Sequence, residues 1–101
     1  KIMDLKCPGS GEVHRNRFEN LNHLSPKDEI KFVIKDRRDF EWAADVVKQY
    51  ALLSRCPVLF SPVFGELEPR QLAEWVLESG LPVRLQLQIH KYIWGPDGRG
   101  V

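Results

Sequence analysis

The chain has 101 residues, 43% hydrophobic and 29% charged, enough for one small domain and too few for several. Its formal net charge of +1 lacks the basic excess of a sequence-independent nucleic-acid binder, so no nucleic-acid partner is expected. No apolar run approaches the roughly 20 residues of a membrane-spanning helix, and two distant cysteines indicate no disulfide framework, so we expect a cytoplasmic protein without a membrane partner.

Four segments predict β-strands, because they are apolar or alternating runs rich in β-branched and aromatic residues and are bounded by Pro, Gly or Asp. They are residues 1–6, 29–34, 57–64 and 83–90. The chain begins inside the first of these runs and without Met, which leads us to expect a fragment of a longer protein.

Three further segments predict helices. Residues 14–24 predict a short helix with apolar residues along one side, although its asparagines favour local turns. Residues 39–53 show apolar residues at helical spacing after Asp39, which is a favourable N-cap. Residues 69–79 predict a helix that begins at Pro69 and stops at a glycine.

Alternation of strands and helices predicts β-α-β crossovers and parallel strands. The strands are not continuously apolar, and residues 83–90 alternate strictly between apolar and polar side chains. We therefore expect a single α/β domain over residues 1–101, with about four mainly parallel strands forming half of a partial (β/α) barrel. Helices would cover its outer face, the concave face would be polar, and residues 95–101, rich in Gly and Pro, would form a flexible tail.

Polar residues follow the first predicted strand and continue into a Pro-Gly-Ser-Gly turn. They are Asp4, Lys6, Pro8 and Ser10. Carboxyl ends of parallel strands are where α/β folds bind ligands, and glycine allows a close approach of the backbone. The alternative interpretation is an ordinary loop with a solvated Asp-Lys pair.

Two more polar groups follow later strands. Ser61 and Pro62 end the third strand at the same edge, where a ligand could meet the hydroxyl, or the chain could simply turn into the next helix. Gln88, His90 and Lys91 offer amide, imidazole and ammonium groups that suit a heterocycle or a carboxylate. The alternative for this second group is a solvent-facing edge strand.

The remaining candidate residues give weaker indications of a functional site. The cysteines Cys7 and Cys56 and the three histidines lack the paired spacing of a metal site, so none is expected within this chain. Arg37 and Arg38 fit a solvated turn, although they could meet an anion near the end of a strand.

Four sequence blocks resemble, in order and spacing, the C-terminal half of the 7-carboxy-7-deazaguanine synthase family: DLKCPGSGE at 4–12, DEIKFVI at 28–34, PVLFSPV at 57–63 and LQLQIHKYIWG at 85–95. This family belongs to the radical S-adenosylmethionine superfamily, together with the organic radical activating enzymes. The resemblance implies a lyase that converts 6-carboxy-tetrahydropterin to 7-carboxy-7-deazaguanine in queuosine and deazapurine biosynthesis. It also implies a [4Fe-4S] cluster, S-adenosylmethionine and Mg²⁺.

The resemblance carries over to individual residues. It implies that Asp4, Lys6, Pro8, Ser10, Ser61 and Pro62 help to bind the cosubstrate, and that Gln88, His90 and Lys91 approach the pterin. The Cys-x-x-x-Cys-x-x-Cys loop that holds the cluster in this family is missing, so the chain alone is expected to be inactive and to bind none of these cofactors tightly. Without an upstream neighbour the first strand would have an open edge, which favours a homodimer.

Two other functions stay open at this point. One is a different radical-activating enzyme of the same superfamily, which would install a glycyl radical on a partner protein. The other is a stand-alone binding or interaction module whose polar face meets solvent or a partner.

Overall fold

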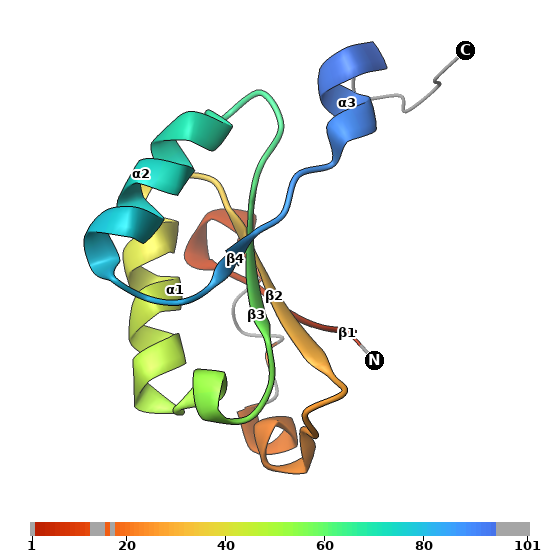
Figure 1. Ribbon diagram of the computed structural model, residues 1–101, viewed down its shortest axis with the longest axis vertical. Coiled ribbons are helices and arrows are strands. Elements are labelled where there is room, and N and C mark those ends of the chain that lie inside the picture. Colours follow the sequence, from red (N-terminus) through yellow and green to blue (C-terminus); the bar gives the residue numbers. More distant parts are fainter. Residues whose placement is uncertain (1, 13–15, 17, 95–101) are drawn as a thin grey trace.

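A computed structural model describes residues 2–12, 16 and 18–94 as a four-stranded sheet with helices beside it (Figure 1). The strands β1 (Ile2–Leu5), β2 (Glu29–Ile34), β3 (Val58–Pro62) and β4 (Arg84–Leu85) lie in the order β1-β2-β3-β4, and each neighbouring pair is parallel. The predicted α/β class with four parallel strands is confirmed. The tail predicted at 95–101 lies outside the described residues.

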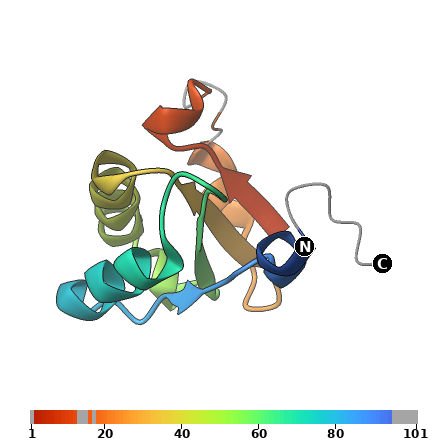
Figure 2. The ribbon, with the colours of Figure 1, turned by 90° about the horizontal axis from the view of Figure 1, so that it is seen from above.

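Two helices cover one face of the sheet. α1 (Arg37–Gln49) connects β2 to β3 and α2 (Pro69–Ser79) connects β3 to β4, and both lie on the same side of the strands (Figures 1 and 2). The short helix α3 (Ile89–Trp94) lies on the other side. The helix predicted over 14–24 is a 3-10 helix at Phe18–His23, and residues 14, 15 and 17 lie outside the described part.

The boundaries of the long helices follow their caps. α2 coincides with its prediction, with Pro69 in the first turn and Gly80 at φ 72° after the last. α1 begins two residues before the predicted start because Asp36, and not Asp39, is the N-cap: an Asp36 carboxylate oxygen accepts a 3.0 Å hydrogen bond from the Asp39 N–H. Asp39 has a different role, described below.

The core forms where alternate side chains of the strands meet the helices. Ile30, Phe32 and Ile34 of β2 are fully buried, whereas Lys31 is half-buried and Val33 is exposed, so the predicted alternation of β2 is confirmed. The Phe60 ring of β3 lies 5.4 Å from the ring of Phe32. The apolar faces of neighbouring strands therefore join into one buried surface under α1 and α2.

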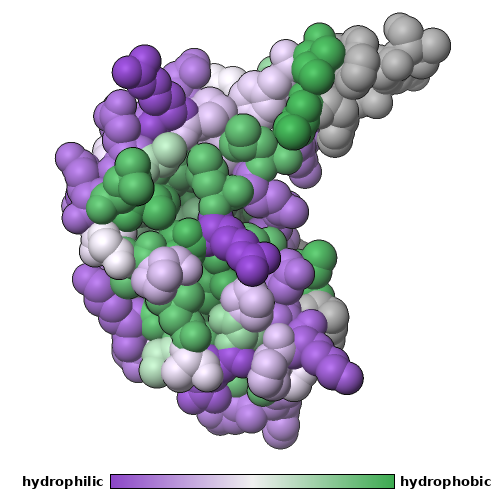
Figure 3. Space-filling model, viewed as in Figure 1, coloured by the Kyte–Doolittle hydropathy of each residue, from purple (hydrophilic) through white to green (hydrophobic). Residues whose placement is uncertain are grey.

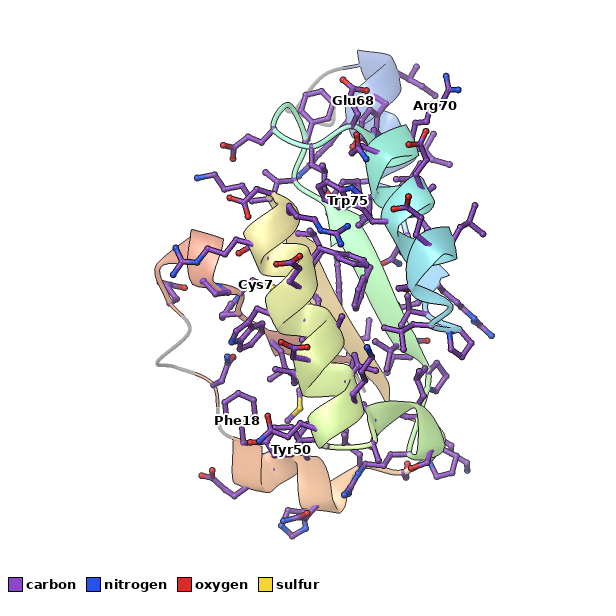
Figure 4. All side chains as sticks on the ribbon, turned by 90° about the vertical axis from the view of Figure 1, so that its left-hand side faces the viewer. Cys7, Phe18, Tyr50, Glu68, Arg70 and Trp75 are labelled. Carbon is purple, nitrogen blue, oxygen red and sulfur yellow. The ribbon has the colours of Figure 1, made fainter. Side chains whose placement is uncertain are left out.

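Aromatic residues fix the helices on this surface. Trp75 lies between α1 and α2 with its ring 5.6 Å from that of Phe40, and Phe18 stacks on Tyr50 at the far end of α1 (Figure 4). The Arg37 guanidinium lies over both Phe40 and Trp75 and pairs with Glu41. Arg37 is thus used in helix packing, while Arg38 is exposed.

The strand predicted over 83–90 is wrong beyond its first residues. β4 contains only Arg84–Leu85, and its last ladder bond runs from the Gln86 N–H to the Phe60 carbonyl at 2.9 Å. The next bond of a parallel ladder would need an N–H from Pro62, which has none. The chain therefore leaves the sheet, and Ile89, expected on an apolar strand face, is exposed on α3. Figure 3 shows apolar residues, in green, on the projection that α3 forms.

No helix within the described residues has the length and apolar character that crossing a bilayer requires.

The homodimer expected from the sequence stays a prediction, and β1 provides its test. Among the described residues β1 pairs only with β2, and Ile2 is 61% exposed at this edge. We expect the chain to self-associate in a light-scattering concentration series and Ile2→Lys to weaken this association, because a charge on an edge strand opposes further pairing. Leu77→Lys, on exposed α2 surface, is the matched control. A monomeric mass for the unaltered chain at high concentration would contradict the prediction.

Candidate ligand pocket at the carboxyl edge of the sheet

A pocket of about 310 Å³ lies where β1, β2 and β3 end. β1 and the turn after it contribute more than half of the lining, and the segments that follow β2 and β3 supply most of the rest. The lining residues are Asp4, Leu5, Lys6, Cys7, Gly9, Ser10, Val33, Lys35, Asp39, Val63 and Glu66. This is the edge at which parallel α/β sheets bind their ligands.

The turn after β1 is a single 3-10 turn at Pro8–Ser10. The Ser10 hydroxyl donates to the Cys7 carbonyl at 2.7 Å and accepts from the Glu12 N–H at 3.0 Å. Gly11 ends the turn at φ 73°, a left-handed conformation that glycine adopts without steric cost. The turn is therefore closed by its own residues and presents Ser10 at the pocket.

Charged groups of both signs line the pocket. Lys6 Nζ lies 3.0 Å from a carboxylate oxygen of Asp4, and Lys35 Nζ lies 3.7 Å from one of Glu66. All four side chains are 39% to 50% exposed. Exposed ion pairs of this kind contribute little to stability, so these groups can exchange their partner for a ligand at low cost. The pocket suits a molecule that carries both an ammonium and a carboxylate.

Asp39 is the charged residue that sequence reasoning misread. Its side chain is 1% exposed, and its two carboxylate oxygens accept hydrogen bonds from the Gly9 N–H at 2.7 Å and the Lys35 N–H at 3.0 Å. The helix-start pattern at residues 36–39 offers two aspartates, and nothing in it distinguishes the one that caps from the one that turns inward. The contact with Gly9 joins residues 30 positions apart, which no local pattern indicates.

Cys7 lies in the strand-end block, which is the DLKCPGSGE segment at residues 4–12, but it is a buried thiol. Burial, and then the negative charge of Asp39, raise its pKa to about 12, so the sulfur stays protonated at neutral pH. Burial also raises the pKa of Cys56, and both cysteines are free. The described residues contain no group of three or more His, Cys, Asp or Glu side chains placed to hold a metal ion.

The structure brings one predicted group of site residues together. Asp4, Lys6 and Ser10 all line the pocket, and Pro8 lies in the same turn. Ser61 and Pro62 are buried in β3, directly before the lining residue Val63. Their roles in binding stay predictions.

The other predicted group lies at the start of α3 and not on a strand. Gln88 is exposed and its carbonyl accepts from the Lys91 N–H at 2.9 Å, while the side chain of His90 lies outside the described part. None of the described residues that line the pocket comes from α3. A T-shaped contact between the rings of Phe64 and Tyr92, 4.9 Å apart, connects α3 to the segment after β3.

The raised pKa of Cys7 predicts that the folded protein becomes less stable at alkaline pH. The folded thiol has a pKa of about 12, against 9.0 without burial, so the unfolded chain loses this proton first as the pH rises. The free energy of unfolding should therefore be unaffected below pH 9 and fall between pH 9 and 12, by about 2 kcal/mol at pH 10.5. Urea denaturation at pH 8 and pH 10.5 measures this decline, which Cys7→Ala should reduce more than Cys56→Ala does, although the pKa of Cys56 is also raised. Equal declines in Cys7→Ala and the unaltered chain would contradict the assignment.

Curated relatives named 7-carboxy-7-deazaguanine synthase are similar to nearly the whole chain. The one from Chlorobaculum tepidum is 46% identical over 103 residues, covering 99% of this chain and 47% of its own length. That from Koribacter versatilis is 47% identical and covers 100% of the chain and 50% of itself. That from Leptospira interrogans is 48% identical over 98% of the chain and 43% of itself.

The chain spans about half the length of the curated relatives it matches. No family model matches the chain, and no solved structure matches it significantly. The relatives nevertheless bear the name to which the four sequence blocks pointed. Over nearly its whole length, therefore, the chain is a homologue of the 7-carboxy-7-deazaguanine synthases.

Proposed function

We propose that this chain is the part of a radical S-adenosylmethionine lyase that supplies a ligand pocket at the carboxyl edge of its sheet. The whole enzyme would convert 6-carboxy-tetrahydropterin to 7-carboxy-7-deazaguanine. The observation that carries this proposal is the sequence identity of 46% to 48% with synthases of that name over almost the whole chain. We also propose a cytoplasmic enzyme, because free cysteines suit a reducing compartment.

The charges of the pocket support a role in binding the cosubstrate. The methionine end of S-adenosylmethionine carries an ammonium and a carboxylate. Asp4 can accept hydrogen bonds from the ammonium and Lys6 can donate to the carboxylate, since both side chains are partly exposed beside each other. Pro8 restricts the backbone of the turn, and the Ser10 hydroxyl adds a polar contact at its end. Ser61 and Pro62 would support the same edge from β3.

The pterin would approach from the side on which α3 lies. Gln88, His90 and Lys91 belong to the segment that leaves the sheet and enters α3, on the face opposite α1 and α2 (Figure 2). An amide, an imidazole and an ammonium can recognise the heterocycle and the carboxylate of this substrate. Specificity for a pterin over a peptide would come from these residues.

The residues of this chain do not fit the cluster or the magnesium ion of such an enzyme. A [4Fe-4S] cluster in this superfamily needs three thiolates, whereas the sequence contains two cysteines, both buried and protonated. The described residues also offer no group of three carboxylates, histidines or cysteines for a metal ion. We therefore propose that the chain alone is inactive.

Two alternatives make different predictions. A glycyl-radical activating enzyme would recognise a peptide loop, and a stand-alone module would bind neither S-adenosylmethionine nor a deazaguanine. The shared name of the relatives favours the synthase over both.

The decisive experiment uses the protein translated from the complete reading frame that contains these residues. Prepared without oxygen and supplied with S-adenosylmethionine, a reductant and 6-carboxy-tetrahydropterin, it should form 7-carboxy-7-deazaguanine, detected by liquid chromatography and mass spectrometry. The 101-residue chain under the same conditions should form none. Failure of the complete, cofactor-loaded protein to form this product would overturn the proposal.

Substitution of Lys6 tests the pocket within that assay. Lys6→Met removes the ammonium and should raise KM for S-adenosylmethionine about tenfold to a hundredfold, as expected for a lost hydrogen bond to a charged group. Lys48→Met removes an exposed ammonium from the last turn of α1, whose first turn lies at the pocket, and should leave KM unchanged. Equal KM values for Lys6→Met and the unaltered enzyme would exclude Lys6 from the site.

A further inference from the structure

Asp39 connects two parts of the pocket from within the protein. One carboxylate oxygen accepts from the Gly9 N–H in the turn after β1, and the other accepts from the Lys35 N–H after β2. Both bonds are charge-assisted, the one from Gly9 is short at 2.7 Å, and the side chain that accepts them is almost completely buried. A single carboxylate therefore sets the spacing between two backbone segments whose side chains line the pocket.

Gly9 shows how close this contact is. A Cβ atom on Gly9 would lie 2.6 Å from one Asp39 carboxylate oxygen and 3.0 Å from the other. The carboxylate cannot simply rotate away, because the Lys35 N–H holds its second oxygen. The turn can approach Asp39 at this distance only with glycine at position 9.

The position of α1 is fixed independently. Phe40, the residue after Asp39, is 3% exposed and its ring contacts those of Phe60 and Trp75. The Asp39 N–H is itself held by the Asp36 cap. Because Asp39 belongs to this well-packed helix and binds the Gly9 N–H, it fixes the turn that carries Ser10 relative to α1.

We propose that Asp39 is the positioning residue of the pocket, holding the Pro8–Ser10 turn against the end of β2 so that Lys6 and Ser10 are placed to bind a zwitterionic ligand. This inference rests on the proposed function for the identity of the ligand, S-adenosylmethionine. Asp39 is too buried to carry the charge recognition itself, which belongs to the exposed groups of Asp4 and Lys6.

The test uses the ¹⁵N-labelled chain and three variants. Asp39→Asn keeps the shape of the side chain but turns an NH₂ group toward one of the two backbone N–H donors. Gly9→Ala keeps the carboxylate and pushes the turn away from it, so it gives a second test if Asp39→Asn does not fold. Asp45→Asn removes an exposed carboxylate from the same helix and is the matched control.

Two readouts are measured on folded protein at a temperature well below unfolding. The first is hydrogen exchange of the Gly9 and Lys35 amides, and the second is the dissociation constant for S-adenosylmethionine from chemical-shift titration. We expect Asp39→Asn and Gly9→Ala to accelerate exchange at Gly9 and to weaken binding about tenfold or more, because misplacement of a binding group by about 1 Å is sufficient for such a loss. Asp45→Asn should change neither readout.

The possible failures are distinguishable. Folded variants that bind S-adenosylmethionine as tightly as the unaltered chain would overturn the positioning role and leave the proposed function standing. Faster exchange at Gly9 with unchanged affinity would show a structural contact only and would likewise overturn the inference. An unaltered chain that shows no shifts at Lys6 or Ser10 would overturn the assignment of this ligand to the pocket, and the inference with it.

Discussion

The structure depends on one packing constraint, the burial of alternate residues of β2 and β3 beneath α1. Ile30, Phe32 and Ile34 lose all contact with solvent, and Phe60 extends the same surface across β3. Complete burial of each such side chain contributes about 1.5 to 3 kcal/mol. Two helices are enough to cover only one face of a four-stranded sheet. The opposite face, where Lys31 alternates with the exposed Val33, is therefore left uncovered by these helices, and the pocket lies at the carboxyl edge.

Asp39 joins this core to the pocket. Phe40 and Ala43 of the same helix are buried in the core, whereas the Asp39 carboxylate accepts hydrogen bonds from backbone groups of the two segments that frame the site. A buried carboxylate is tolerated here because each oxygen is satisfied by an N–H donor. Burial, and then the negative charge of Asp39 beside it, raise the pKa of Cys7 and keep that thiol protonated. Cys7 therefore contributes only to packing. The groups at this edge that can interact with a ligand are its lysines, its exposed carboxylates and the Ser10 hydroxyl.

Much of the fold could be predicted because its signals are local. The alternation in β2 and the Pro and Gly residues that bound α2 depend on neighbours in the sequence, and both elements have nearly the expected limits. The end of β4 depends instead on Pro62 in another strand, which lacks the next ladder donor. Residues 83–90 alternate as a strand should, yet the sheet cannot continue to pair with them. For the site, the strand-end block was found from its position and composition, while Asp39 was misread because its partners are distant in the sequence.

The topology of the sheet explains why the predicted site residues fall into two separate groups. Asp4, Lys6 and Ser10 converge because β1 is paired along its length with β2, and Lys35 and Val63 directly follow the next two strands at the same level. Gln88 and Lys91 do not join them, because β4 stops after two residues and α3 starts on the other side of the sheet. A ring contact between Phe64 and Tyr92 connects α3 to the segment that runs from β3 into the pocket. A ligand that touched both groups would have to extend from the carboxyl edge across the face that α1 and α2 leave uncovered. A cosubstrate and a substrate bound side by side would meet this requirement, with one at the edge and the other beside α3.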